Sequence, residues 1–282
     1  LHSAKAGFLG RIVTKMMGRK SVFSPHGGSY LSFTGVKRIM FFLLEVIGKK
    51  SSYKALAISQ SEALRMIYEI GFKKENVFVI PNSLPFPGFP KDIPDNLGKL
   101  EGEFKVGTIG RLTQQKDPEL FADIANEIIK HNPGVHFYFL GAGYHDHLRK
   151  EVDERVKKHG IESNFHLIDM GDRNKAFNFL RQMNVFLLPS IYEGLPYSLL
   201  EAMQERVPCV VSKCDGNNDV INNNENGFSC MLLPEYTEII NRLIKDPQLA
   251  KKIGEAGYKH VYEKLNMTTN IRLLENMYTA II

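Results

Sequence analysis

The sequence predicts an α/β protein in which helices cover both faces of parallel sheets. Two observations lead to this class. Short apolar runs alternate with helix-length segments along most of the chain, and a proline-rich stretch divides the chain into two parts. Strands that alternate with helices pair in parallel, because each crossover helix brings the chain back to the same end of the sheet. The 282 residues are enough for two modest domains, each with its own core.

The first part of the chain contains a predicted strand, helix and strand. Residues 55–58 and 77–80 are apolar runs typical of short buried strands, and a helical pattern lies between them. Five of the thirteen prolines lie between residues 81 and 103, where they interrupt helix and strand periodicity. We therefore expect a first domain over residues 1–92 and a second over residues 93–282, with the final helix able to pack back on the first domain.

The second part continues the alternation of strands and helices. Its apolar runs predict strands at residues 104–109, 135–140, 164–168, 185–188 and 209–211. Such a sheet is buried on both faces, and ligands bind beyond the carboxyl ends of its strands. The residues that directly follow each strand are therefore the candidates for a binding site.

Composition excludes several classes of protein. The chain is 43% hydrophobic and 24% charged, which is typical of a folded domain. The longest apolar run, residues 39–44, is far shorter than the ~20 residues of a membrane span, and the first residues lack the pattern of a signal peptide. Cys209, Cys214 and Cys230 are odd in number and lack CxxC spacing, which argues against a disulfide framework or a zinc site. A reducing cytoplasm is the expected compartment.

Positive charge is concentrated at the start of the chain. Residues 1–58 contain ten Lys and Arg and a single acid, Glu45, so this stretch carries +9. The whole chain carries +5, so the remainder carries −4. This asymmetry indicates an anionic partner for the first part: nucleic acid, a membrane surface or a phosphorylated acceptor.

Two cations follow the predicted strand at residues 104–109. Arg111 and Lys116 lie in a loop that leads to a helix, for which Asp117 is the expected N-cap and Pro118 the first residue. A guanidinium fork and an ammonium group both suit a diphosphate, whose negative charge also favours a helix N-terminus. Two solvated cations near a turn are the alternative interpretation.

Two glycines, Gly141 and Gly143, follow the next predicted strand and allow the backbone to approach a ligand closely. They are not a dinucleotide-binding fingerprint, because Asp146 stands where the third glycine of GxGxxG belongs. Taken alone, this signal is weak.

The most informative segment runs from Pro189 to Met203, from the end of a buried strand into a helix. It places two carboxylates eight residues apart. Glu193 lies in the loop, where it would face a bound ligand, and Glu201 lies about a turn or more inside the helix among apolar side chains. The alternative is an acid that complements the helix dipole and a second, partly buried acid that is satisfied locally.

Together these motifs resemble family 4 of the retaining glycosyltransferases, which have the GT-B fold. Residues 193–201 resemble the EX7E element of that family, and residues 110–116 resemble its diphosphate-binding loop. Residues 1–7, 24–27 and 215–219 are similar to members that assemble bacterial polysaccharides. The resemblance covers nearly the whole chain. It implies two Rossmann-like domains, the N-terminal one incomplete, because further strands precede this point in the family.

The resemblance implies a role for each candidate residue. Arg111 and Lys116 would clamp the donor diphosphate, and Glu201 would bind the ribose. Glu193 and His26 are the expected catalytic residues, with Glu193 on the hydroxyls of the transferred sugar and His26 reaching toward that sugar from the acceptor domain. A structural histidine is the alternative for His26. Further contacts are expected from Gly194, Leu195, Tyr197 and Ser198 to the phosphates and the sugar, and from Gly143 and Met170 to the base.

The implied reaction transfers a sugar from a nucleoside diphosphate sugar to a hydroxyl of a glycan or lipid-linked acceptor, with retention, in surface polysaccharide or glycolipid assembly. No metal or other cofactor is expected, because cations and a helix N-terminus would stabilise the leaving diphosphate. Nucleic acid is not an expected partner. The alternatives are a GT-B phosphorylase, an epimerase-type hydrolase of nucleotide sugars, and a non-catalytic subunit that binds a nucleotide sugar or a lipid.

The basic segment predicts a membrane contact. Residues 7–17 place apolar side chains at helical spacing, with Arg11 and Lys15 four residues apart on another face. A core-packed helix with a solvated charged face is the alternative. Because the resemblance implies a lipid carrier, we favour peripheral docking to an anionic membrane, at the inner face of the cell membrane.

Overall fold

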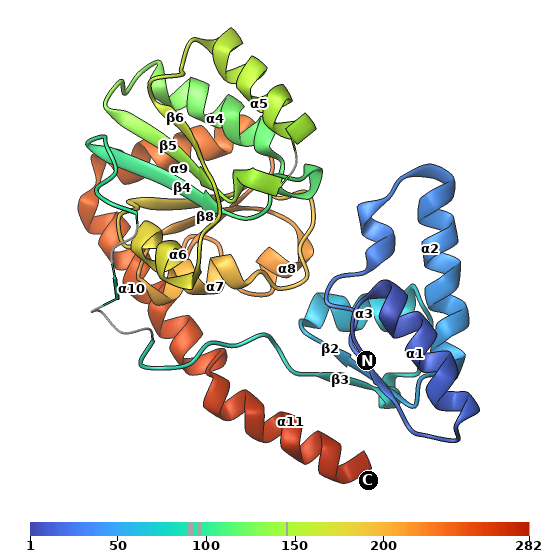
Figure 1. The fold of residues 1–282 in the computed structure, drawn as a ribbon. Coiled ribbons are helices and arrows are strands. Elements are labelled where there is room, and N and C mark those ends of the chain that lie inside the picture. The colour runs from blue at the N-terminus through green and yellow to red at the C-terminus, as the bar shows by residue number, and fades with distance from the viewer. Residues whose placement is uncertain (89–92, 95–96, 145, 282) are drawn as a thin grey trace.

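A computed structural model describes residues 1–88, 93–94, 97–144 and 146–281. It contains two separate parallel sheets with helices around them (Figure 1). This confirms the predicted α/β class. The expected boundary between residues 92 and 93 involves residue 92, which lies outside the described residues.

The N-terminal part, residues 1–80, carries a sheet of three parallel strands in the order β1-β2-β3. Its strands and helices are β1 (Val22–Phe23), β2 (Lys54–Ala57), β3 (Val77–Val79), α1 (Ala4–Met16), α2 (Gly35–Gly48) and α3 (Gln60–Tyr68). The predicted strand, helix and strand are β2, α3 and β3. Ser59 begins α3 because its hydroxyl accepts a hydrogen bond from the Glu62 amide at 3.1 Å.

The C-terminal part, residues 104–264, carries six parallel strands in the order β6-β5-β4-β7-β8-β9. The strands are β4 (Phe104–Ile109), β5 (Val135–Leu140), β6 (Phe165–Ile168), β7 (Val185–Leu188), β8 (Cys209–Ser212) and β9 (Phe228–Cys230). The helices are α4 (Pro118–Ile129), α5 (Asp146–His159), α6 (Arg173–Leu180), α7 (Tyr197–Gln204), α8 (Asp215–Asn218), α9 (Leu233–Lys245) and α10 (Pro247–Lys264). The five predicted strands are confirmed. The sixth, β9, was not predicted.

Helices cover both faces of the six-stranded sheet (Figure 1). One buried cluster joins the sheet to α4, α5 and α9 through side chains such as Phe121, Val152 and Ile240. A second cluster joins the opposite face to α6, α7 and α10 through side chains such as Phe179 and Leu199. The two covered faces leave the strand ends free, so the loops beyond the strands can form a site.

The last helix, α11 (Met267–Ile281), lies against the three-stranded sheet of the N-terminal part. Its Met277 and Ile281 are buried with Leu56 of β2. The Lys20 ammonium donates a hydrogen bond to the Ile281 carbonyl at 2.6 Å. The chain therefore ends on the part in which it began.

The interpretation of Arg11 as a cation on an outer face of the first helix is wrong. Its side chain is fully buried, and its Nη2 atom donates to Glu45 Oε2 of α2 at 2.8 Å. The guanidinium carbon lies 3.7 Å from the centre of the Phe23 ring. Two glycines make this possible, because a Cβ atom on Gly48 would lie 2.7 Å from Arg11 Cζ and one on Gly7 would lie 2.5 Å from the Phe23 ring. Arg11 is buried because it forms an ion pair between α1 and α2, a tertiary contact that helical spacing alone does not reveal.

Candidate functional site

The loops that follow β4, β5 and β6 meet at one edge of the six-stranded sheet. The Gly110 amide donates to the Leu140 carbonyl at 3.0 Å, and the Gly141 amide donates to the Ile168 carbonyl at 2.8 Å. Gly141 has a φ of +121°, and a Cβ atom there would lie 2.1 Å from the Gly110 carbonyl oxygen. This close approach requires glycine.

Gly143 and Met170, the expected neighbours of the base, lie in this group of loops. A Cβ atom on Gly141 would be 3.2 Å from Met170 Cε, and one on Gly143 would be 3.2 Å from Asp169 Oδ1. The ends of β5 and β6 therefore form one side of the candidate site.

The helix that follows Arg111 and Lys116 begins as predicted. Asp117 is the N-cap of α4 and accepts a hydrogen bond from the Leu120 amide at 3.0 Å, and Pro118 is the first helical residue. Asp117 has a φ of +48°, a left-handed conformation that asparagine and aspartate tolerate better than most residues. This cap ends the loop that carries both cations.

Lys116 and Glu193 form an ion pair. Lys116 Nζ lies 2.6 Å from Glu193 Oε1, and the two side chains are only 15% and 6% exposed. Gln115 extends this contact, because its Nε2 atom donates to Glu193 Oε2 at 3.3 Å and to the Tyr192 carbonyl at 3.1 Å. Sequence reasoning missed Gln115, which lies between the two predicted cations.

Glu201 lies on α7, which begins at Tyr197 and Ser198 directly after the loop of Glu193. Its side chain is 15% exposed and lies 3.5 Å from Arg173 Nη2. Burial raises the pKa of the Glu201 carboxyl above its usual range, and the nearby Arg173 guanidinium opposes this rise. A carboxylate that is largely shielded from solvent can bind hydroxyl groups strongly.

The N-terminal part touches the same loop. A Cβ atom on Gly194 would lie 3.2 Å from the Gly27 amide nitrogen, and the Tyr192 hydroxyl donates to Ser32 Oγ at 2.7 Å. Asn82 Nδ2 donates to the Leu195 carbonyl at 2.9 Å. The turn of His26 and Gly27 is thereby placed beside the residues predicted to contact the donor.

His26 has a left-handed backbone, with φ of +56°, and its Nε2 atom lies 2.7 Å from Nδ1 of His2. Burial lowers the pKa of the His26 imidazole, and the neighbouring His2 lowers it further. Glu62 holds the turn from below, because its Oε1 atom accepts the Gly27 amide at 2.5 Å and its Oε2 atom accepts the Ile58 amide at 2.8 Å. In the sequence, the only signal for Glu62 is its position three residues after Ser59, which is the spacing of a capping box.

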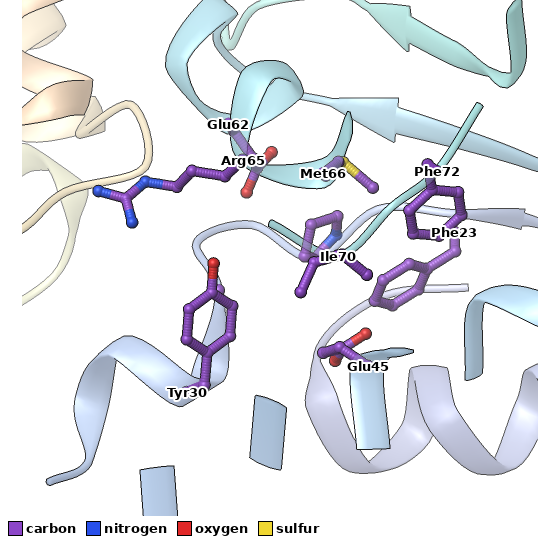
Figure 2. Close-up of a pocket in the computed structure, with 10 residues that line it drawn as sticks. Phe23, Tyr30, Glu45, Glu62, Arg65, Met66, Ile70 and Phe72 are labelled. Atoms are coloured by element: carbon purple, nitrogen blue, oxygen red, sulfur yellow. The ribbon is translucent and has the colours of Figure 1, made fainter. Parts of the chain in front are cut away.

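Figure 2 shows the cavity beneath this turn. It is surrounded by apolar side chains and by the carboxylates of Glu45 and Glu62. Its volume of about 20 Å³ holds roughly one water molecule. Arg65 points away from it, toward Asp215 of the C-terminal part, with which it forms an ion pair. The cavity is too small for a sugar.

A larger cleft of about 340 Å³ opens between the two parts. Ligand pockets in proteins begin at about this size. It is lined by Ser32 of the N-terminal part and by residues from the loops of the C-terminal part, which are Arg111, Thr113, Gln114, Gln115, Leu148 and Tyr192. Arg111 is exposed there, on the same loop as Lys116 of the Lys116–Glu193 pair.

Within residues 1–88, 93–94, 97–144 and 146–281, no group of three His, Cys, Asp or Glu side chains is arranged to hold a metal ion. Over the same residues, every helix is too short or too polar to cross a lipid bilayer. The three cysteines are free.

Comparison with known proteins identifies the family. The family model described as "Glycosyl transferases group 1" matches residues 90–260. A UDP-Gal:α-D-GlcNAc-diphosphoundecaprenol α-1,3-galactosyltransferase of Escherichia coli is 28% identical over all of this chain and 74% of its own length. The O-antigen biosynthesis glycosyltransferase WbnH of Escherichia coli is 30% identical over 84% of this chain and 62% of its own length.

The fold has a close structural neighbour. The crystal structure of Anabaena Alr3699/HepE in complex with UDP-glucose has a TM-score of 0.84 over 99% of this chain and 77% of that protein, at 19% sequence identity. Such a low identity supports the fold alone, and it confirms the expected GT-B-like architecture. Because the family model covers more than half of the sequence, the chain belongs to the glycosyl transferases group 1 family.

Proposed function

We propose that this protein is a retaining glycosyltransferase of family 4, which moves a sugar from a nucleoside diphosphate sugar to a hydroxyl of a glycan or lipid-linked acceptor. One observation carries the proposal. Arg111 lines a cleft between the two parts, and the same loop carries Lys116, which forms a buried pair with Glu193 in the loop before α7. Cations, a carboxylate and a helix start thus share one edge of the sheet.

The donor diphosphate would lie between Arg111, Lys116 and the first turn of α7. The first amides of a helix lack partners within the helix and attract negative charge, so those of Tyr197 and Ser198 suit a phosphate. The backbone at Gly194 and Leu195 would contact the sugar. Transfer releases the nucleoside diphosphate, and these cations would stabilise its growing charge without a metal ion.

The nucleoside would extend toward the ends of β5 and β6. Glu201 would accept hydrogen bonds from ribose hydroxyls, and Gly143 and Met170 would lie near the base. UDP is the favoured nucleotide, because the Anabaena neighbour is a UDP-glucose complex and the Escherichia coli relative is named for a UDP-galactose donor.

The acceptor would approach from the N-terminal part. His26 directly precedes Gly27, which lies beside Gly194. The lowered pKa of His26 leaves a neutral imidazole near pH 7, which can both donate and accept a hydrogen bond. Glu193 and His26 would then both contact the transferred sugar. The names of both Escherichia coli relatives favour an acceptor in surface polysaccharide assembly, and one names a lipid-linked diphosphate.

A thermal-shift panel tests the donor assignment. We expect UDP and UDP-sugars to raise the melting temperature increasingly with ligand concentration, and other nucleoside diphosphates to raise it less, because a ligand that binds the folded state stabilises it according to its concentration relative to its dissociation constant. Product analysis with lipid-linked glycans then identifies the acceptor and the anomeric configuration. A chain that turns over no donor with any acceptor but binds UDP would be a binding subunit instead.

The two carboxylates are expected to bind different parts of the donor, Glu201 the nucleotide and Glu193 the sugar. Glu201→Gln should weaken UDP and the intact UDP-sugar alike, because a ribose contact is common to both ligands. Glu193→Gln should weaken the intact donor more than UDP. Calorimetric titration measures both affinities, with Glu205→Gln as the control, since Glu205 pairs with Arg181 at the end of α7. Equal losses for both ligands in Glu193→Gln contradict this division of roles.

A further inference from the structure

The helix α3 joins the turn of His26 to the C-terminal part. On one side, the Glu62 carboxylate accepts the Gly27 amide at 2.5 Å and so holds this turn. On another side, Arg65 Nε donates to Asp215 Oδ2 of α8 at 2.6 Å, and Arg65 Nη2 donates to the same oxygen. Figure 2 shows Glu62 and Arg65 pointing in different directions from the same helix.

A second contact joins α3 to α8. The Ser61 amide, in the first turn of α3, donates to both carboxylate oxygens of Asp219 at 3.2 Å each. Asp215 begins α8 and Asp219 directly follows it, so each end of this short helix contributes one carboxylate. Figure 1 shows α8 on the side of the C-terminal part that faces α3. We call these two contacts, Arg65 with Asp215 and Ser61 with Asp219, the brace.

α8 in turn supports the loop of Glu193. A Cβ atom on Gly216 would lie 2.5 Å from the Gly194 carbonyl oxygen and 2.8 Å from the Glu193 carbonyl carbon, so the backbone of α8 packs directly on this peptide. Asn217 attaches α8 to the sheet, because its Nδ2 atom donates to the Ser212 carbonyl of β8 at 3.0 Å. α8 is therefore fixed to the Glu193 loop and to the C-terminal part.

The ion pair of the brace is suited to orientation more than to stability. The Arg65 and Asp215 side chains are 28% and 43% exposed, and an ion pair at such a position contributes little to the free energy of unfolding. Two nitrogens of one planar guanidinium contact the carboxylate, which fixes direction as well as distance. Glu69, one turn along α3, lies 3.5 Å from Arg65 Nη1 and orients the guanidinium from the other side.

We propose that the brace sets the position of the His26 turn relative to the Glu193 loop, with Arg65 as a positioning residue for sugar transfer. The proposal rests on the proposed function, in which His26 and Glu193 both contact the transferred sugar. These two residues come from different parts of the chain, so their spacing depends on contacts between the parts. A misplacement of about 1 Å can lower a rate about 100-fold. The expected donor contacts lie within the C-terminal part, so loss of the brace lowers kcat and leaves donor affinity unchanged.

Kinetics of Arg65 variants test the brace. The probes are UDP for calorimetric titration and, for turnover, the UDP-sugar and lipid-linked glycan selected by the thermal-shift panel and product analysis. Arg65→Ala should lower kcat about tenfold or more, and it should change the UDP dissociation constant and the donor KM by less than about twofold. Arg65→Lys keeps the charge without the fork and should recover part of kcat. Arg65→Asp with Asp215→Arg should recover more than either single substitution, because it restores an ion pair of reversed polarity.

Hydrogen exchange of the Ser61 amide reports the brace independently of activity. This amide is bonded to Asp219 across the two parts, so Arg65→Ala should raise its exchange rate. Arg155→Ala is the matched control, because Arg155 forms an ion pair with Asp123 at similar exposure, 33% and 31%, inside the C-terminal part. The control should keep the parental kcat and the parental exchange of Ser61. Melting temperatures verify that each variant folds.

Three outcomes would overturn the proposal. Parental kcat in Arg65→Ala shows that the brace does not position the reacting groups. A loss of UDP affinity as large as the loss of kcat assigns Arg65 to donor binding instead. An equal loss of kcat in Arg155→Ala shows a general effect of stability. A parent protein that binds no UDP contradicts the proposed function itself, whereas a parent that binds UDP and transfers sugar no faster than Arg65→Ala contradicts the brace alone.

Discussion

Replacing Arg111 or Lys116 with alanine is expected to lower the affinity for UDP by about one to two orders of magnitude. A hydrogen bond to a charged group in a protected cleft contributes roughly 1.5–3 kcal/mol. A loss of about 1.4 kcal/mol raises the dissociation constant tenfold. Isothermal titration calorimetry with UDP provides the measurement. Lys130→Ala serves as the control, because Lys130 is an exposed cation paired with Glu127 at the far end of α4.

The two substitutions should differ in their effect on stability. Arg111 is exposed, so its loss should leave the free energy of unfolding nearly unchanged. Lys116→Ala leaves the buried Glu193 carboxylate without its ion-pair partner and should also destabilise the fold. The double variant Lys116→Met with Glu193→Gln removes both charges and should regain much of that stability without regaining UDP affinity. Parental UDP affinity in both single variants would rule out the diphosphate clamp.

Arg11→Ala is expected to destabilise the protein by about 3–5 kcal/mol. The reason is that breaking a buried ion pair leaves a charged partner without compensation. Burial raises the pKa of the Glu45 carboxyl and lowers that of the Arg11 guanidinium, and each charge offsets this shift in the other. Removing Arg11 also takes away the guanidinium that stacks on Phe23. Urea denaturation followed by circular dichroism measures the change.

A second variant separates the ion pair from simple packing. Arg11→Met with Glu45→Leu replaces both charges by apolar side chains and should lose far less stability than Arg11→Ala, because no unpaired charge is left in the core. Lys15→Ala, one turn further along α1 on an exposed position, is the control and should change stability by about 0.5 kcal/mol or less. If Arg11→Ala behaves like Lys15→Ala, the pair does not hold α1 to α2.

Much of the secondary structure follows from local patterns. The apolar runs at residues 104–109 and 135–140 coincide with β4 and β5, and Asp117 with Pro118 begins α4 as expected. The edge strand β9 escaped prediction because it has only three residues, too few for a clear alternation. It forms because the free edge of β8 offers backbone hydrogen-bond partners, with Val210 opposite Phe228.

Local patterns also located the candidate site, but not its internal contacts. Residues directly after strands were expected to converge, since the carboxyl ends of parallel strands share one edge, and Arg111, Gly141 and Glu193 do follow β4, β5 and β7. Their roles in binding stay predictions. Gln115, Glu62 and the Tyr192 contact with Ser32 had no signal of their own, because each depends on which loop lies opposite.

The sequence by itself thus determined most of the elements, their order and the edge of the sheet at which the candidate residues lie. Only the tertiary structure decided which charges meet. Arg11 pairs with Glu45 across 34 residues, Lys116 with Glu193 across 77, and Arg65 with Asp215 across 150. Caps and hydrophobic periods depend on neighbours within about one helical turn. An ion pair instead depends on how helices and loops pack across the sheets. For this reason one cation of the basic segment, Arg11, is buried, whereas another, Lys37, is exposed.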